Sequence, residues 1–231
     1  MNGEPSKRKH DLIIDKIVDC VEKGTFKPNK KIYSEHRLSN ILGINRGPVR
    51  ETIAALEILG VVSSKQGEGT YLNAFSLENS SKALSLLLLL DEVDIKDISQ
   101  VRRIMEMAAV ELSAVNRSAE NLALLKNCLH NMSKLDDPVR LANEDVRFHT
   151  LLASFSGNVL LKNLVNIFAV YIGRISVKNW KYFLQHEKSK AQQVIEQHQA
   201  ILKGIAVKDP SLCRAAMERH ISFAEEQFYP R

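Results

Sequence analysis

The stretch that decides the fold reads Gly43-Ile44-Asn45-Arg46-Gly47-Pro48-Val49-Arg50-Glu51. Gly43 can end a helix, because glycine readily adopts the left-handed conformation found just after many helices. Asn45 can cap the next helix, and Pro48 suits the first turn of that helix, where a missing N–H costs little. The stretch therefore predicts two helices joined by a tight turn, which is the helix-turn-helix arrangement.

The sequence on either side completes one small domain. Apolar residues recur at helical spacing before the turn and along the helix that follows it. A glycine-rich segment, Gln66-Gly67-Glu68-Gly69, then separates two short strand-like runs, as in a β-hairpin. We expect three helices plus a β-hairpin wing, with helices over Asp11–Lys23, from Ser34 to Leu42 and from Asn45 to Leu59, and strands over Val61–Lys65 and Thr70–Leu72.

The rest of the chain has a different pattern. Asn73–Ser81 is rich in Asn and Ser, as linkers are, and from Lys82 onward apolar residues follow helical spacing with no strand pattern. We predict a mainly α protein, with a winged helix-turn-helix over residues 8–73, a linker over 74–81 and an all-α antiparallel helical bundle over 82–231. The expected bundle helices are Lys82–Leu90, Asp97–Asn116, Ala119–Leu135, Pro138–Phe155, Val159–Ile175, a broken helix over Lys178–Val207, and Pro210–Phe228.

Composition limits the class of protein. The 231 residues include three cysteines without a C-x-x-C pair, which fits a reducing cytosol rather than a disulfide framework. The longest apolar run, Leu86–Leu90, is far shorter than the ~20 residues of a membrane span. The formal net charge of +5 permits an anionic partner without requiring one. We expect a cytoplasmic protein with no membrane partner.

The third helix carries candidate DNA contacts. Arg46 and Arg50 lie four residues apart and so project from one face, where a guanidinium can pair with O6 and N7 of guanine. Gly47 allows close approach to the DNA, and the hairpin tip with Gln66 and Gly67 would reach the minor groove or phosphates. Two arginines alone could simply be solvated on a surface helix. The complete pattern of cap, Arg, Pro, Arg-Glu and glycine hairpin favours DNA binding.

This part of the chain resembles the GntR family of bacterial regulators. The family block runs from a Ser-Glu-x-x-Leu helix through Arg-x-x-Val-Arg-Glu and Leu-x-x-x-Gly to a wing that ends Gly-x-Gly-Thr. The matching residues here are Ser34-Glu35, Leu38, Arg46, Val49-Arg50-Glu51, Leu56, Leu59-Gly60 and Gly67-Glu68-Gly69-Thr70.

Three positions depart from the family pattern. Tyr33 stands where a proline is usual, and Asn45 stands where a small hydroxyl residue is usual. His36 stands where FadR-like members often have an arginine that contacts DNA, and the neighbouring Arg37 could take over that contact. These departures leave the operator sequence open. The resemblance implies that DNA is contacted by Arg46, Arg50, His36, Arg37, Asn45, Gly47, Gln66 and Gly67.

The helical part contains a candidate metal-binding set. Asp145 and His149 lie four residues apart on one face of a predicted helix, and His198 and His220 lie on later helices. Three imidazoles and one carboxylate suit Zn²⁺ or a similar divalent ion. The spacing alone does not bring the three helices together, so histidines that serve only the core or the surface remain an alternative.

Residues 82–228 resemble the C-terminal domain of FadR-like members, known as the FCD domain. The hallmarks are Arg102-x-x-x-Glu106, then Asp145 with Phe148-His149 and Gly157-Asn158, then His198, Asp209 and His220. The resemblance implies a divalent metal ion, first Zn²⁺ with Ni²⁺ or Mn²⁺ as alternatives, held by Asp145, His149, His198 and His220. It also implies that Arg102 pairs with an effector carboxylate; a surface salt bridge to Glu106 is the alternative.

The expected function follows from these two resemblances. We expect a ligand-responsive transcription regulator, a repressor, that binds a near-palindromic double-stranded operator as a homodimer and senses a small carboxylate. One alternative is a metal-dependent enzyme with a DNA-binding appendage. Another is a metal sensor in which the ion itself is the signal.

Overall fold

The computed structural model describes residues 8–74 and 94–228. The chain divides into two compact units, with one of these ranges in each, and each unit is described by itself below. The predicted helix Lys82–Leu90 and residues 75–81 of the predicted linker lie outside the described residues.

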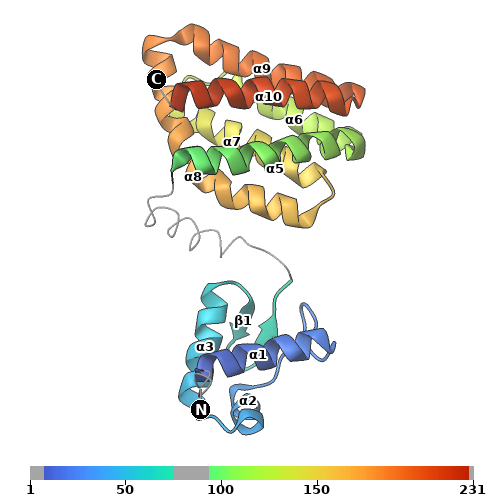
Figure 1. The fold of residues 1–231 in the computed structure, drawn as a ribbon, viewed down its shortest axis with the longest axis vertical. Helices are drawn as coiled ribbons and strands as arrows, with labels where there is room; N and C mark the ends of the chain where they lie inside the picture. The colour runs from blue at the N-terminus through green and yellow to red at the C-terminus, as the bar shows by residue number, and fades with distance from the viewer. Residues whose placement is uncertain (1–7, 75–93, 229–231) are drawn as a thin grey trace, which may run out of the picture. The chain divides into compact units, whose positions relative to one another are not determined.

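The N-terminal unit is the predicted winged helix-turn-helix (Figure 1). Strands β1 and β2 pair antiparallel, with Val62 opposite Leu72 and Lys65 opposite Gly69, and Lys31 adds an isolated bridge to Tyr71. The elements are α1 (Lys9–Glu22), α2 (Glu35–Leu42), α3 (Arg46–Ile58), β1 (Val62–Lys65) and β2 (Gly69–Leu72).

The turn between α2 and α3 has the expected local geometry. The Ser34 hydroxyl accepts the Arg37 backbone N–H, and Gly43 follows α2 at φ 62°. A residue with a Cβ is strained at that angle, so glycine gives this turn its tightness. Asn45 occupies the N-cap position of α3, but its side chain makes no capping hydrogen bond. Buried residues from all five elements, among them Ile13, Leu38, Val49, Val62 and Leu72, form the core beneath the turn.

The C-terminal unit is the predicted all-helical bundle (Figure 1). Helix α7 packs against α5, α6 and α8, and α10 packs against α5 and α9. The helices are α5 (Ile95–Asn116), α6 (Ala119–Met132), α7 (Pro138–Phe155), α8 (Val159–His186), α9 (Lys188–Val207) and α10 (Pro210–Phe228). Each contributes to one buried cluster, which includes Val110, Leu125, Phe148, Trp180, Ile201 and Met217.

One pair of predicted helix boundaries was wrong. The sequence suggested a helix over Val159–Ile175 and a broken helix over Lys178–Val207, whereas α8 continues through residues 176 and 177 to His186 and the break falls at Glu187, inside the second predicted segment. Residues 176 and 177 are Ser and Val, which do not stop a helix.

No single helix in the two described ranges is long and apolar enough to cross a membrane. Two parts of α8, Val159–Ala169 and Tyr171–His186, meet at an angle of 50° and meet the criteria of length and composition only when taken together as a bent pair.

Candidate metal centre and nucleic-acid interface

Helix α3 presents the predicted DNA contacts to solvent. Val49 and Ile53 are buried in the domain core and fix the rotation of the helix about its axis. The opposite face therefore points outward, and on it Arg46, Gly47 and Arg50 are exposed. This is the geometry that a recognition helix needs to enter a major groove.

The predicted contacts on α2 have partners within the protein. The Arg37 guanidinium lies 3.9 Å from the centroid of the Tyr33 ring, and His36 Nδ1 lies 2.7 Å from an Arg46 side-chain nitrogen. Asn45 is exposed between the two helices. These residues thus form one continuous polar surface with the start of α3.

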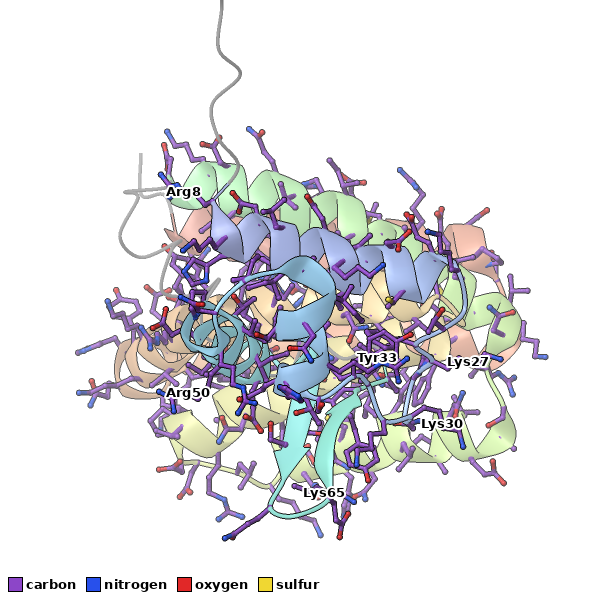
Figure 2. The ribbon with its side chains drawn as sticks, turned by 90° about the horizontal axis from the view of Figure 1, so that it is seen from below. Arg8, Lys27, Lys30, Tyr33, Arg50 and Lys65 are labelled. Atoms are coloured by element: carbon purple, nitrogen blue, oxygen red, sulfur yellow. The ribbon has the colours of Figure 1, made fainter. Side chains whose placement is uncertain are left out.

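The wing carries a second exposed surface. Gln66 and Gly67 lie at its tip, as predicted from the sequence. Figure 2 shows Arg50 on one side of the hairpin and Lys27 and Lys30 on the other, with Lys65 near the tip. These exposed lysines were not among the predicted DNA contacts, although Lys27-Pro28-Asn29-Lys30-Lys31 is visibly lysine-rich. Such lysines suit phosphate contacts, which position a protein on DNA without reading sequence.

The structure brings the four candidate metal ligands together. Asp145 and His149 come from α7, His198 from α9 and His220 from α10, and one ligand atom of each lies within 4.8 Å of all the others. All four side chains are buried. His198 Nε2 is 3.1 Å from Asp145 Oδ1, and His149 Nε2 is 3.2 Å from His220 Nε2.

Each imidazole in this cluster is oriented by an oxygen behind it. Nδ1 of His198 donates to the Val194 carbonyl at 2.8 Å, and Nδ1 of His220 lies 3.1 Å from Gln197 Oε1. Nδ1 of His149 faces Oε2 of Glu106. These oxygens accept protons, so in the neutral rings each Nδ1 carries the hydrogen and each Nε2 presents a lone pair to the centre.

The centre then holds facing acceptors that need a positive charge between them. Asp145 Oδ1 and His198 Nε2 are buried without a hydrogen bond to any described residue, while Asp145 Oδ2 accepts from Ser176 Oγ at 2.8 Å. A proton on Nε2 of His198 would form a hydrogen bond to Asp145 only. The Nε2 lone pairs of His149 and His220 would still face each other. A tetrahedral Zn²⁺ site sets N and O ligands about 3.4 Å apart, close to the separations found here. The cluster could therefore bind a metal, and the residues present fit one.

Electrostatic interactions keep Asp145, the acidic member of the cluster, ionised. Burial alone would raise the pKa of Asp145, but the imidazoles of His198, His149 and His220 outweigh it and hold that pKa well below its usual range. For His220, burial and the neighbouring imidazoles lower the pKa well below the ordinary value. A divalent cation requires an ionised carboxylate and neutral imidazoles, and the shifts of Asp145 and His220 both favour those forms.

Arg102 both pairs with Glu106 and faces a cavity. Its Nε donates to Glu106 Oε1 at 2.6 Å, and both side chains are buried. The alternative salt bridge expected from the sequence is thus present, inside the unit rather than on its surface. Burial would raise the pKa of Glu106, but Arg102 and His149 hold it well below its usual range. No other hydrogen bond of the Arg102 guanidinium is found within residues 8–74 and 94–228.

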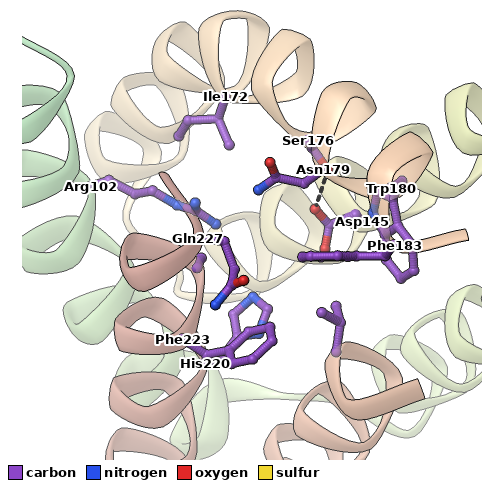
Figure 3. Close-up of a pocket in the computed structure, with 12 residues that line it drawn as sticks. Arg102, Asp145, Ile172, Ser176, Asn179, Trp180, Phe183, His220, Phe223 and Gln227 are labelled. Atoms are coloured by element: carbon purple, nitrogen blue, oxygen red, sulfur yellow. Dashed lines mark hydrogen bonds between the residues drawn. The ribbon is translucent and has the colours of Figure 1, made fainter. Parts of the chain in front are cut away.

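The cavity adjoins the metal-ligand cluster. Arg102, Asp145 and His220 are among its walls. Figure 3 shows Arg102 and Gln227 facing Ser176, Asn179 and Asp145 across it. Its apolar walls are Ile172, Trp180, Phe183, Val194, Phe223 and Ala224.

Comparisons with known proteins agree with both units. Residues 9–72 match the bacterial regulatory proteins of the gntR family, and residues 97–223 match the FCD domain. The chain is 32% identical over 207 residues to the HTH-type transcriptional regulator LutR of Bacillus subtilis, covering 89% of this chain and 94% of LutR. It is 28% identical over 222 residues to a putative L-lactate dehydrogenase operon regulatory protein of Escherichia coli, covering 94% and 85% of the two chains.

A solved structure shares the fold. Streptococcus agalactiae GntR aligns with a TM-score of 0.64 at 23% identity, covering 93% of this chain and 98% of that one. The matches set aside the alternative of a metal-dependent enzyme, because both units and the full-length relative are those of transcription regulators. The chain therefore belongs to the GntR family of bacterial regulatory proteins, with an N-terminal DNA-binding helix-turn-helix and a C-terminal FCD domain.

Proposed function

We propose that this regulator represses transcription by binding a near-palindromic operator as a homodimer and is controlled by a small carboxylate that binds beside a metal ion. The observation that carries the proposal is the buried set of four ligand atoms next to a cavity that Arg102 enters. A helix-turn-helix dimer puts two recognition helices into successive major grooves, which accounts for the two-fold symmetry of the operator.

The proposed DNA contacts are the exposed residues of α2, α3 and the wing. Arg46 and Arg50 would read base edges, and His36, Arg37, Asn45, Gly47, Gln66 and Gly67 complete the surface. The test is operator binding by the wild type and by the double variant Arg46→Ala, Arg50→Ala, with Lys126→Ala on the exposed face of α6 as control. If the double variant bound a selected operator as tightly as the wild type does, the proposal that Arg46 and Arg50 contact DNA would be wrong.

We propose that Asp145, His149, His198 and His220 hold one divalent ion, Zn²⁺ first, with Ni²⁺ or Mn²⁺ as alternatives. When bound, the ion supplies a positive charge that attracts carboxylate and hydroxyl oxygens of a ligand. Metal analysis of the protein as purified should find about one ion per chain. His198→Gln should lose it, whereas His130→Gln, at an exposed position on α6, should keep it. Equal metal content in both variants would contradict the site.

The effector class follows from the walls of the cavity. Arg102 offers a charged fork for a carboxylate, Asn179 and Ser176 offer polar groups, and aromatic side chains cover the rest. A small 2-hydroxycarboxylate suits this mixture. L-lactate is the first probe, because one relative is described as a regulator of an L-lactate dehydrogenase operon.

Two measurements test the effector. Trp180 is the single tryptophan of the chain and lines the cavity, so its fluorescence should report binding. A carboxylate that binds the metal-loaded protein should also release operator DNA in a reporter or gel-shift assay. If a chelator alone releases the DNA and no carboxylate changes its binding, the protein is a metal sensor instead.

A further inference from the structure

One contact on the DNA-binding surface joins its two helices. The Nη2 atom of Arg46 at the start of α3 lies 2.7 Å from Nδ1 of His36 in the first turn of α2. Both side chains are exposed, so the contact does not result from burial. It spans the tight turn at Gly43, which brings the starts of the two helices together.

The chemistry of the two groups fixes the direction of this hydrogen bond. A guanidinium only donates, so His36 Nδ1 must accept, and the ring is neutral with its proton on Nε2. The side-chain amide nitrogen Nδ2 of Asn40, one turn further along α2, lies 3.4 Å from Nε2, and a flip of the amide exchanges this nitrogen for its oxygen. The amide oxygen can accept the Nε2–H when it is turned towards the ring. Asn40, His36 and Arg46 then form a chain in which both ring nitrogens of His36 are used.

We propose that His36 is a positioning residue that orients the Arg46 guanidinium for base recognition and does not itself read a base edge. The inference rests on the proposed base contact of Arg46. With Nδ1 engaged by Arg46 and Nε2 by Asn40, no ring nitrogen of His36 is left for a base edge. The arginine keeps its Nε, Nη1 and second Nη2 hydrogens, which is enough for the two-pronged pairing with guanine.

The benefit of such an arrangement is preorganisation. A free arginine side chain loses rotamer freedom when it is fixed on DNA. A side chain held in the reading orientation before binding loses less, so both affinity and base discrimination rise. Arg50 offers the matched comparison, because no hydrogen bond or ion pair of its side chain is found within the described ranges.

The test begins with selection of operators from a randomised double-stranded DNA library by the wild-type protein. Affinity for the selected operator is then measured for His36→Ala, Arg46→Ala, Arg50→Ala and the two double variants that include His36→Ala. We expect His36→Ala to weaken binding roughly 3- to 10-fold, the worth of one hydrogen bond. It should relax preference at the same base pair as Arg46→Ala, have no further effect in the Arg46→Ala background, and act additively with Arg50→Ala.

A conservative variant separates positioning from a structural role. His36→Gln retains a side-chain oxygen that can accept from Arg46, so it should recover most of the lost affinity, whereas His36→Lys should not. Full additivity with Arg46→Ala, or loss of preference at a different base pair, would show that His36 reads a base itself and would overturn the inference. If the wild type enriches no sequence, the proposed operator binding fails, and this inference fails with it.

Discussion

His149 and Glu106 are buried in contact with each other, with Nδ1 of the imidazole facing Oε2 of the carboxylate. The other oxygen of Glu106 accepts a hydrogen bond from Nε of Arg102 at 2.6 Å. One carboxylate thus links a proposed metal ligand to the proposed effector-binding arginine. A carboxylate behind a ligating histidine fixes the ring and makes its other nitrogen a stronger donor to the metal.

Removing the charge of Glu106 should weaken the proposed metal site. Glu106→Gln keeps the size of the side chain but loses the negative charge behind His149, so we expect metal affinity to fall about 10- to 100-fold. Competition with a chromophoric chelator measures it. Glu144→Gln is the control, since that carboxylate pairs with Arg147 on the same helix. Equal affinity in Glu106→Gln and the wild type would contradict the role of Glu106.

Arg102→Lys should separate effector binding from metal binding. Lysine keeps the positive charge beside Glu106 but loses the planar fork that pairs with a carboxylate in two places. We expect effector affinity, read from Trp180 fluorescence, to fall about 10-fold, with metal content unchanged. Arg174→Lys, at an exposed position of α8, should leave both unchanged. Unaltered effector affinity in Arg102→Lys would exclude a two-pronged contact.

The buried carboxylates should make the metal-free protein sensitive to acid. Despite burial, which would raise them, the pKa values of Asp145 and Glu106 lie well below their usual range because of the neighbouring imidazoles and Arg102. A folded-state pKa below the unfolded value of about 4 stabilises the fold above that value. This stabilisation is lost as the pH falls, so the free energy of unfolding in urea should drop between about pH 5 and pH 3.

Asp145→Asn should reduce that pH dependence, because one of the two titrating carboxylates is gone. The exposed Asp136→Asn on the loop before α7 is the matched control and should follow the wild-type profile. The measurement is a series of urea titrations of chelated protein at stepped pH. A parallel profile for Asp145→Asn would show that this carboxylate does not contribute.

The cysteines should be unreactive in the native protein. All three are buried, and burial raises the pKa of Cys213 to about 12 and that of Cys128 further still. The thiolate is the reactive form, so at pH 8 Cys213 should react with a thiol reagent roughly a thousandfold more slowly than an unfolded cysteine. Three equivalents should react rapidly in urea. Rapid reaction of Cys213 under native conditions would show that the α9–α10 region opens.

Sequence patterns predicted the helix-turn-helix well because its determinants are local. The Ser34 cap, the left-handed Gly43 and the Gly67–Gly69 hairpin each act within a few residues, and the structure has all three. The boundary of α8 was missed because no glycine or proline marks the break at Glu187. The exposed lysines beside the wing were missed because their relation to the hairpin depends on the bridge between Lys31 and Tyr71.

The sequence by itself determined the two kinds of unit, the position of the hairpin turn and the identity of the residue types that could bind a metal. Caps, turns and apolar periodicity encode these features over short distances. Only the tertiary structure decided that Asp145, His149, His198 and His220 converge, that oxygens behind the rings turn each Nε2 inward, and that Arg102 reaches both Glu106 and the cavity. Those relations depend on how α5, α7, α9 and α10 pack, and side-chain packing between distant helices leaves no local pattern in the chain.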